Sequence, residues 1–322
     1  SEYMKQYNRF LDPKKDLGAF SAMIVLYLAI MTGVSFLWSF VISSFIVGRY
    51  KGDPLEMQQQ LTESISKDGM SYIIAVLIGV ILFSLYRKGA LFKGDVRQKG
   101  RKMTWKTFLV FIVFLGFAQL VSATIGQILN QMLETLGFYN PQEDMSEQLS
   151  QSWSLLLYAT LLGPITEELV FRGAGLRALE KFGKVFAILM TAIIFGLFHA
   201  NLDQLFFAII IGLGFGYLTF EYSFWWAIFF HIFNNLVLSQ GLHYLGTHVN
   251  ENLSDFIQVL VFVGGTIAFT VVLIVKRKEI LHYIQENRPA PGVFQRSMYS
   301  FWFWVVVLGT TLMSLLPYLR GY

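Results

Sequence analysis

Residues 153–172 read WSLLLYATLLGPITEELVFR, an almost continuous apolar stretch that contains two adjacent glutamates, Glu167 and Glu168. A helix of about 20 apolar residues is long enough to span the hydrocarbon core of a bilayer. Ionisable side chains inside such a helix are costly and usually serve a function. The stretch therefore predicts a transmembrane helix whose two glutamates belong to a functional site.

The composition of the whole chain is that of an integral membrane protein. The 322 residues are 55% hydrophobic and 14% charged, whereas soluble domains carry about 25% charged residues. We therefore predict an all-α fold, a polytopic transmembrane helical bundle of eight or nine transmembrane helices with a buried polar site. Nine apolar runs are candidates for these helices, namely residues 19–47, 70–86, 107–137, 153–171, 185–199, 205–220, 224–238, 256–275 and 299–318.

The placement of Lys and Arg predicts the orientation in the membrane. If the N-terminus is cytoplasmic and every run spans, 21 of the 25 Lys and Arg residues fall on the cytoplasmic side. An excess of Lys and Arg in cytoplasmic loops is the usual pattern. The inside segments are residues 1–18, 87–106, 172–184, 221–223 and 276–298, and the four basic residues outside are Arg49, Lys51, Lys67 and Arg320. Because no organelle signal is seen, we expect a bacterial plasma membrane.

Several classes of function are excluded by what the chain lacks. The sequence has no cysteine, so thiol catalysis, disulfides and Cys-ligated metals are excluded. No basic run is interleaved with aromatic residues, which a nucleic-acid groove would need. We therefore expect no nucleic-acid partner, and the lipid bilayer itself is the first partner that the composition indicates.

The two glutamates are expected to play different parts. Residues four apart lie on one face of a helix, so Glu168 and Arg172 are placed to form a salt bridge. Glu167 lies about 100° round the helix and has no such partner. A carboxylate that is free to accept a proton is a candidate general base, and this favours Glu167.

Two further polar positions interrupt apolar helices. His199 ends the run IIFGLFHA, and His231 lies within WAIFFHIFNN, four residues before Asn235. Glu167 and His199 stand 16 residues before and after Gly183. In a helical hairpin that turns at Gly183, both would lie about 24 Å above the turn. We therefore expect Glu167, His199, His231 and Asn235 to meet near one depth.

The ordered motifs Glu-Glu-x-x-x-Arg, Phe-x-x-x-His and His-x-x-x-Asn, on successive membrane helices, resemble those of the CAAX-protease and bacteriocin-processing (CPBP, Abi) family of intramembrane peptidases. The resemblance covers about residues 150–240. It implies a membrane-embedded endopeptidase that acts on a peptide or protein substrate at the membrane. By the same resemblance, Glu167 activates water, His199 helps to hold that water, and His231 and Asn235 stabilise the oxyanion, with Glu168 and Arg172 accessory.

The resemblance also suggests how the chain is divided. We expect an N-terminal three-helix membrane segment over residues 1–150, a catalytic helical core over 151–240, and C-terminal membrane helices over 241–322. A prenylated C-terminus, a bacteriocin leader and a signalling peptide are all compatible substrates. The sequence does not give the oligomeric state or the membrane face to which the site opens.

Other interpretations of the same residues stay open. No cofactor is expected, but His199, His231 and Glu168 have the composition of a zinc site. A non-catalytic membrane scaffold or bacteriocin-immunity factor on the same fold is the alternative function. A proton-coupled transporter that uses the Glu and His cluster would need two matching halves, and none is seen. Gly212 and Gly216 indicate close helix packing instead of a phosphate loop.

Overall fold

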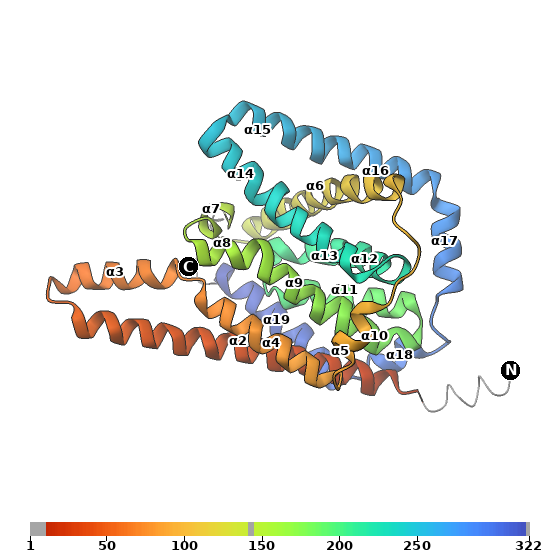
Figure 1. Cartoon of the computed structure of the whole chain (residues 1–322), viewed down its shortest axis with the longest axis horizontal. Coiled ribbons are helices and arrows are strands. Elements are labelled where there is room, and N and C mark those ends of the chain that lie inside the picture. The colour runs from red at the N-terminus through yellow and green to blue at the C-terminus, as the bar shows by residue number, and fades with distance from the viewer. Residues whose placement is uncertain (1–10, 141–144, 320–322) are drawn as a thin grey trace.

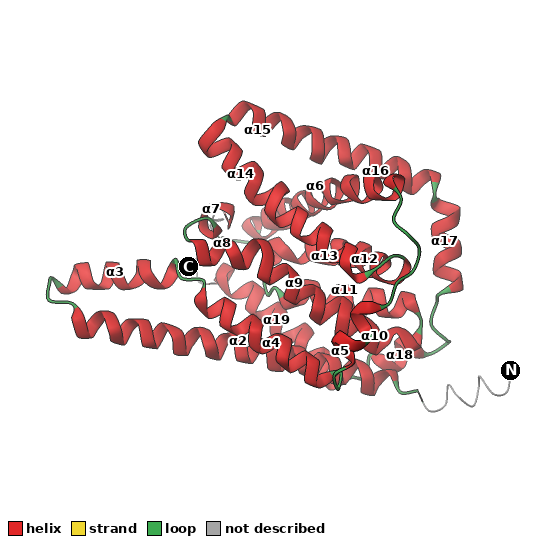
Figure 2. Cartoon of the chain, viewed as in Figure 1, coloured by secondary structure: helices red, strands yellow, loops and turns green. Residues whose placement is uncertain are grey.

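The fold is a bundle of helices, and the long ones run obliquely across the molecule in the view of Figure 1. The computed structural model describes residues 11–140 and 145–319. Within these ranges the regular structure is helical throughout, as Figure 2 shows, apart from one isolated antiparallel bridge between Lys99 and Ser223. The predicted all-α class is therefore confirmed. Lys5, Arg9 and Arg320, which contribute to the predicted charge asymmetry, lie outside the described residues.

The first third of the chain supplies one wall of the bundle. Helix α2 is capped at its start by Asp12, whose carboxylate accepts the backbone N–H of Lys15. Helices α2 and α3 form a hairpin that reaches well beyond the other helices in Figure 1. The elements are α2 (Pro13–Arg49), α3 (Pro54–Ser66), α4 (Met70–Tyr86), α5 (Ala90–Lys93), η1 (Asp95–Arg97), α6 (Trp105–Thr135) and α7 (Met145–Leu149).

The stretch quoted first forms a single rod that is not a regular α-helix. Two of its segments, η2 and η3, are π-helical, so the backbone N–H of Gly163 bonds to the carbonyl of Tyr158, five residues earlier. Wide turns of this kind often occur at functional sites. The rod consists of α8 (Trp153–Leu157), η2 (Tyr158–Leu162), α9 (Gly163–Glu168), η3 (Leu169–Gly175), α10 (Leu176–Leu179) and the 3₁₀ turn η4 (Glu180–Phe182).

The rod turns back into α11 (Lys184–Phe198) at Gly183. The φ angle of Gly183 is 111°, a conformation that side-chain-bearing residues rarely adopt. Helix α11 packs closely against α12 (Leu202–Glu221), because a Cβ atom on Gly212 would touch the backbone of α11. Gly216 lies against Ile188 of α11 in the same way. The close packing expected at these two glycines is therefore present.

The last third of the chain closes the bundle. Helix α16 packs along α6, and α19 packs against both α2 and α11. The chain therefore brings its two terminal parts together around the central rod. The elements are α13 (Phe224–Ile232), η5 (Phe233–Gly241), α14 (Leu242–Tyr244), η6 (Leu245–Val249), α15 (Glu251–Gln258), η7 (Val259–Val263), α16 (Gly264–Val275), α17 (Arg277–Glu286), α18 (Val293–Ser297) and α19 (Phe301–Leu319).

Seven helices in the described part of the chain are long and apolar enough to cross a membrane. They are Pro13–Arg49, Pro54–Tyr86, Trp105–Thr135, Trp153–Phe182, Leu202–Glu221, Glu251–Val275 and Phe301–Leu319. The sequence led us to expect eight or nine. The difference lies in two runs that do form helices. Helix α11 has only 15 residues, and the polar side chains of His231, Asn234 and Asn235 divide the apolar run of the continuous helix that begins at Phe224.

The contact between α6 and η7, the π-helical segment before α16, gives a prediction about stability. A Cβ atom on Gly116 would collide with the carbonyl oxygen of Val261, whereas one on Gly126 of the same helix meets nothing. We expect Gly116→Val to lower the free energy of unfolding by about 1–3 kcal/mol, because overpacking forces the two helices apart. Thermal unfolding in detergent measures the effect. Gly126→Val is the matched control, and equal melting temperatures for the two variants would contradict the prediction.

Candidate active site

The two adjacent glutamates of α9 lie in different surroundings. The side chain of Glu168 is 0% exposed, whereas that of Glu167 is 17% exposed. Neighbouring residues on a helix point in directions about 100° apart. One of the two carboxylates can therefore be fully enclosed while the other reaches solvent. The enclosed carboxylate is suited to a structural part, and the accessible one is suited to chemistry.

The Glu168 carboxylate is held on both of its oxygens. Arg172 donates from Nε to Oε2 at 2.5 Å and from Nη2 to Oε1 at 2.6 Å. The ion pair that the four-residue spacing predicted is therefore present, in the two-pronged geometry that is strongest for arginine and carboxylate. His231 of α13 donates from Nδ1 to the same Oε1 at 2.7 Å.

Aromatic rings surround the Arg172 guanidinium. Its Cζ atom lies 4.3 Å from the centroid of the Phe195 ring, and Phe171 and Phe215 lie within 6 Å. These rings offer a cation–π attraction to a charge that water cannot reach. The Nη1 atom has no hydrogen-bond partner among the described groups. The rings therefore take the place that solvent would occupy, and they shield the ion pair.

Glu168 fixes the orientation and the tautomer of His231. An ionised carboxylate can only accept hydrogen bonds, so Nδ1 of His231 carries the hydrogen that joins the two groups. The other ring nitrogen, Nε2, faces Glu167 and lies 3.4 Å from its Oε2. His231 is thus bound on its enclosed side by Glu168 and presents Nε2 to the accessible carboxylate.

His199 is oriented by a different partner but presents the same atom. It follows the last residue of α11, and its Nδ1 donates to the carbonyl oxygen of Phe195 at 2.7 Å. Its Nε2 lies 3.6 Å from Oε1 of Glu167. The hairpin that turns at Gly183 therefore brings Glu167 and His199 to one level, as their equal separation from the turn led us to expect.

Asn235 is placed by the π-helical turn in the central rod. In the register set by the bond from Gly163 to Tyr158, the next carbonyl, that of Ala159, would accept from residue 164. That residue is Pro164, which has no N–H. Asn235 supplies the missing hydrogen bond, because its Nδ2 donates to the Ala159 carbonyl at 2.9 Å. The missing N–H of Pro164 therefore leads to the anchoring of Asn235.

Two polar residues that the sequence analysis did not select also belong to this network. Asn234 donates to Oδ1 of Asn235 at 3.0 Å, and Gln119 of α6 donates to Oδ1 of Asn234 at 3.0 Å. Gln119 is the one amide side chain among residues 107–126 of α6, and this isolation in an apolar stretch was a signal for it. Asn234 lies beside Asn235 in the sequence, on a neighbouring face of the helix.

A large cavity reaches this cluster. It has a volume of about 1170 Å³, and Glu167, His199, His231 and Asn235 are among its lining residues. Glu168 and Arg172 do not line it. The cavity is therefore lined by Glu167, whose carboxylate faces two imidazoles, whereas the ion pair of Glu168 and Arg172 is buried outside it. A carboxylate with neighbouring imidazoles in a water-accessible space can transfer protons to and from a substrate.

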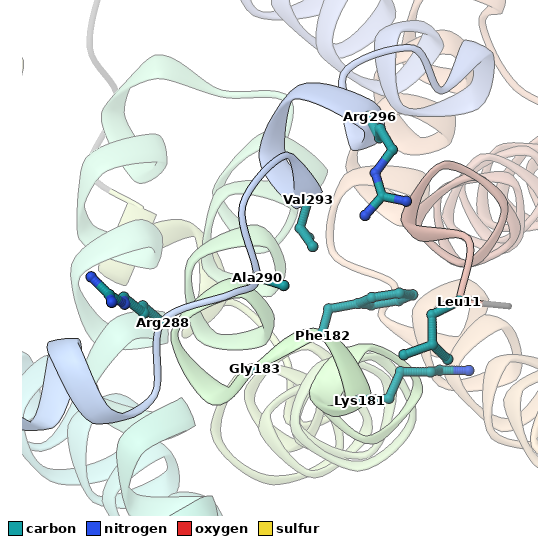
Figure 3. Close-up of a pocket in the computed structure, with 8 residues that line it drawn as sticks. All are labelled: Leu11, Lys181, Phe182, Gly183, Arg288, Ala290, Val293 and Arg296. Atoms are coloured by element: carbon teal, nitrogen blue, oxygen red, sulfur yellow. The ribbon is translucent and has the colours of Figure 1, made fainter. Parts of the chain in front are cut away.

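A smaller cavity of about 220 Å³ lies beside the Gly183 turn. Figure 3 shows its wall, where Arg296 points toward Phe182 and Leu11 while Arg288 turns away. Its described lining residues include no carboxylate and no histidine. It therefore lacks the groups for acid–base chemistry and is not the candidate active site.

The same cluster contains the residues of the alternative zinc site, His199, His231 and Glu168. Among the described residues, no group of three His, Asp or Glu side chains is arranged to hold a metal ion. The zinc alternative requires Glu168 together with His199 and His231. Both Glu168 oxygens are instead engaged by Arg172 and His231. The carboxylate that faces the Nε2 atoms of both histidines is that of Glu167.

The buried ion pair gives a second prediction. Arg172→Met should lower the free energy of unfolding by about 3–5 kcal/mol, because it leaves the Glu168 charge buried without a partner. The double variant Glu168→Gln/Arg172→Met removes both charges and should recover much of the loss. Arg97→Met, at an exposed position, is the control. Thermal unfolding in detergent is the measurement, and a double variant no more stable than Arg172→Met would contradict the argument.

Comparison with known proteins agrees with this geometry. Residues 149–237 match the model of the family "Type II CAAX prenyl endopeptidase Rce1-like". The chain is also 24% identical over 202 residues to the "Putative membrane peptidase YdiL" of Bacillus subtilis (strain 168), an alignment that covers 61% of this chain and 78% of the relative. No solved structure matches the chain.

The matched segment contains the central rod, both histidines and both asparagines of the cluster. The family that the motifs suggested is therefore the family that the comparison finds. Over residues 149–237 the chain is therefore similar to the Rce1-like type II CAAX prenyl endopeptidase family, and over a longer alignment it is similar to the membrane peptidase homologue YdiL.

Proposed function

We propose that this chain is an intramembrane endopeptidase that hydrolyses a peptide bond with water activated by Glu167. The observation that carries the proposal is the position of Glu167. Its carboxylate lies 3.4 Å and 3.6 Å from the Nε2 atoms of His231 and His199, and it lines the large cavity. The similarity of residues 149–237 to a peptidase family supports the same reaction.

In the proposed first step, a water molecule bound at Glu167 attacks the carbonyl carbon of the scissile peptide bond. Glu167 accepts the proton that the water loses as the new carbon–oxygen bond forms. His199 holds the water through Nε2, because its Nδ1 hydrogen is already donated to the Phe195 carbonyl. The carbonyl oxygen of the substrate becomes a negatively charged oxyanion.

The oxyanion needs hydrogen-bond donors that are already in place. We assign this part to His231, from Nε2, and to Asn235, from the second hydrogen of its Nδ2 amide. The anchors at Glu168 and Ala159 fix both side chains. Donation from Nε2 requires a second proton on the His231 ring, and the carboxylates on either side of the ring balance that charge.

The reaction ends with transfer of the proton from Glu167 to the leaving nitrogen. The carbon–nitrogen bond then breaks as the oxyanion returns to a carbonyl, and the products are an amine and a carboxylic acid that loses its remaining proton to solvent. Glu168 and Arg172 take no proton in this scheme and act as positioning residues for His231. A bound metal has no part in these steps, and the proposed cofactor requirement is none. The substrate is a peptide or protein at the membrane.

The finer points of architecture are also proposals. We infer that α11 and the helix Phe224–Gly241 cross the membrane inside the bundle, which gives nine crossings with the N-terminus in the cytoplasm of a bacterial cell. The positive-inside count supports this orientation. The family match falls on the middle of the three segments 1–150, 151–240 and 241–322, which supports a division into a catalytic core and flanking membrane helices.

Substitution of the proposed base tests the function. In liposomes that contain the purified chain, Glu167→Gln and His231→Ala should each slow peptide cleavage by about 10²–10⁴-fold, because each removes one acid–base or oxyanion group. Mass spectrometry of a mixture of synthetic peptides identifies the cleaved bonds. Glu134→Gln, at an exposed position at the end of α6, is the matched control and should cleave at the normal rate.

The two active-site variants should still bind the peptides and should keep the melting temperature of the unaltered chain to within a few degrees. Cleavage at the normal rate in both Glu167→Gln and His231→Ala would show that the peptidase proposal is wrong.

A further inference from the structure

The bundle has two ends, and contacts between loops identify them. At one end, Lys99 pairs with Ser223, and the backbone N–H of Val185 donates to the Asn287 carbonyl at 3.1 Å. We call this the basic end, since its loops hold most of the Lys and Arg residues. At the other end, the N–H of Gly69 donates to Oγ of Ser154 at 2.9 Å. We call this the opposite end.

The large cavity belongs to the opposite end. The described residues that line its outer part come from the end of α3, from α7 and from the start of α12. They are Ile65, Ser66, Lys67, Asp68, Met145, Ser146, Gln148, Gln151, Asp203 and Gln204. None of the described residues in the loops of the basic end lines this cavity. Glu167, His199 and His231 form its inner part.

A layer of buried side chains separates the cluster from the basic end. Phe171, Phe215 and Phe230 are fully buried, and Phe195 is 1% exposed. Arg172, one turn beyond Glu168 toward the basic end, is also fully buried. Close-packed interiors of this kind admit no polypeptide. The site therefore has access to solvent through the opposite end.

From this geometry we propose that the peptide substrate enters from the extracytoplasmic side of the membrane. The positive-inside pattern assigns the basic end to the cytoplasm, so the cavity opens away from it. This inference rests on the proposed peptidase function. It names the substrate class as an extended polypeptide segment outside the cytoplasm, in contrast to a C-terminus presented in the cytosol.

The chemistry of the lining suits an uncharged extended segment. Serine and glutamine side chains recur along the wall, including Ser35, Ser39, Gln119, Gln148, Gln151, Gln204, Ser239 and Gln240. Such groups donate and accept hydrogen bonds and can satisfy the amides of an extended backbone. They alternate with apolar residues such as Leu28, Met31 and Phe207, which leaves room for apolar side chains of the substrate.

The charged residues of the outer lining are engaged within the protein. Lys67 pairs with Glu63 at 2.6 Å. Asp68 accepts from Nε1 of Trp38 at 3.0 Å and from the N–H of Met70 at 2.8 Å. Asp203 accepts from Asn130 at 3.2 Å. Paired charges offer little to a charged ligand, and the described lining therefore favours an uncharged peptide segment.

The natural absence of cysteine makes a direct test possible, because any single introduced thiol is the only one in the chain. Ser39→Cys places it on the cavity wall, Leu37→Cys places it on the 63% exposed outer side of the same helix, and Gln98→Cys places it at the basic end. Spheroplasts of bacteria that produce each variant are treated with a membrane-impermeant maleimide. Labelling after detergent permeabilisation measures the thiols that can be reached from either side of the membrane. Labelling after denaturation measures all thiols.

We expect Ser39→Cys to be labelled in intact spheroplasts and Gln98→Cys only after permeabilisation. Leu37→Cys should stay unlabelled until denaturation, because maleimides react with thiolate in water and lipid surrounds this position. Ser39→Cys that reacts only after permeabilisation, or only after denaturation, would overturn the proposal. Ser146→Cys, a second lining position on α7, replaces Ser39→Cys if that variant is not inserted.

The labelling pattern does not depend on catalysis and should be the same in a Glu167→Gln background. If the peptidase proposal fails, the labelling pattern still shows to which side the cavity opens. If the labelling contradicts the proposed opening, the cleavage experiment still tests the peptidase proposal. In the active protein, the maleimide on Ser39→Cys should reduce peptide cleavage at least tenfold, whereas the one on Gln98→Cys should not. Full cleavage by the labelled Ser39→Cys variant would contradict the proposed route of the substrate.

Discussion

The ion pair between Glu168 and Arg172 is the interaction on which the rest of the site depends. Both side chains are withdrawn from solvent, and two hydrogen bonds of 2.5 Å and 2.6 Å join them. An ion pair buried in this way is retained at the cost of desolvating both charges. Its use here is to place a fixed anion behind His231, so that the imidazole has one orientation and one hydrogen bond to its enclosed side.

The ion pair also gives the adjacent residues Glu167 and Glu168 different roles. Glu168 is saturated by Arg172 and His231, and Glu167 is left at the surface of the cavity, opposite two Nε2 atoms. The same helix then uses a second irregularity, the π-helical turn before Pro164, to anchor Asn235 through the Ala159 carbonyl. Both are local features of one rod, and together they fix His231 and Asn235, which come from the helix after Ser223.

Much of this arrangement could be predicted from the sequence. The apolar runs predicted the helices, and the four-residue spacing of Glu168 and Arg172 predicted their ion pair. The equal distances of Glu167 and His199 from Gly183 gave their common level, since a helix rises by a constant amount per residue. The family resemblance then followed from the order of three motifs, and the comparison with known families found the same one.

Other features depend on packing that residue spacing does not contain. The π-helical register around Pro164 shifts the orphan carbonyl to Ala159, so the partner of Asn235 could not be derived from an ideal helix. Gln119 joins the network only because α6 lies against the helix that carries Asn234. Among the described residues, seven helices are long and apolar enough to be clear membrane spans, because α11 is short and site residues divide the apolar run that begins at Phe224. The direction in which the cavity opens also required the positions of the side chains.

The most direct test of the central claim is the tautomer of His231. Solid-state nitrogen-15 NMR of the chain in lipid bilayers distinguishes a protonated Nδ1 from a bare one, and a His231→Gln sample assigns the signal. The account predicts that Nδ1 of His231 is protonated and hydrogen-bonded to a carboxylate, and that this signal shifts in Glu168→Gln. A His231 ring with a bare Nδ1 and its hydrogen on Nε2 would contradict it.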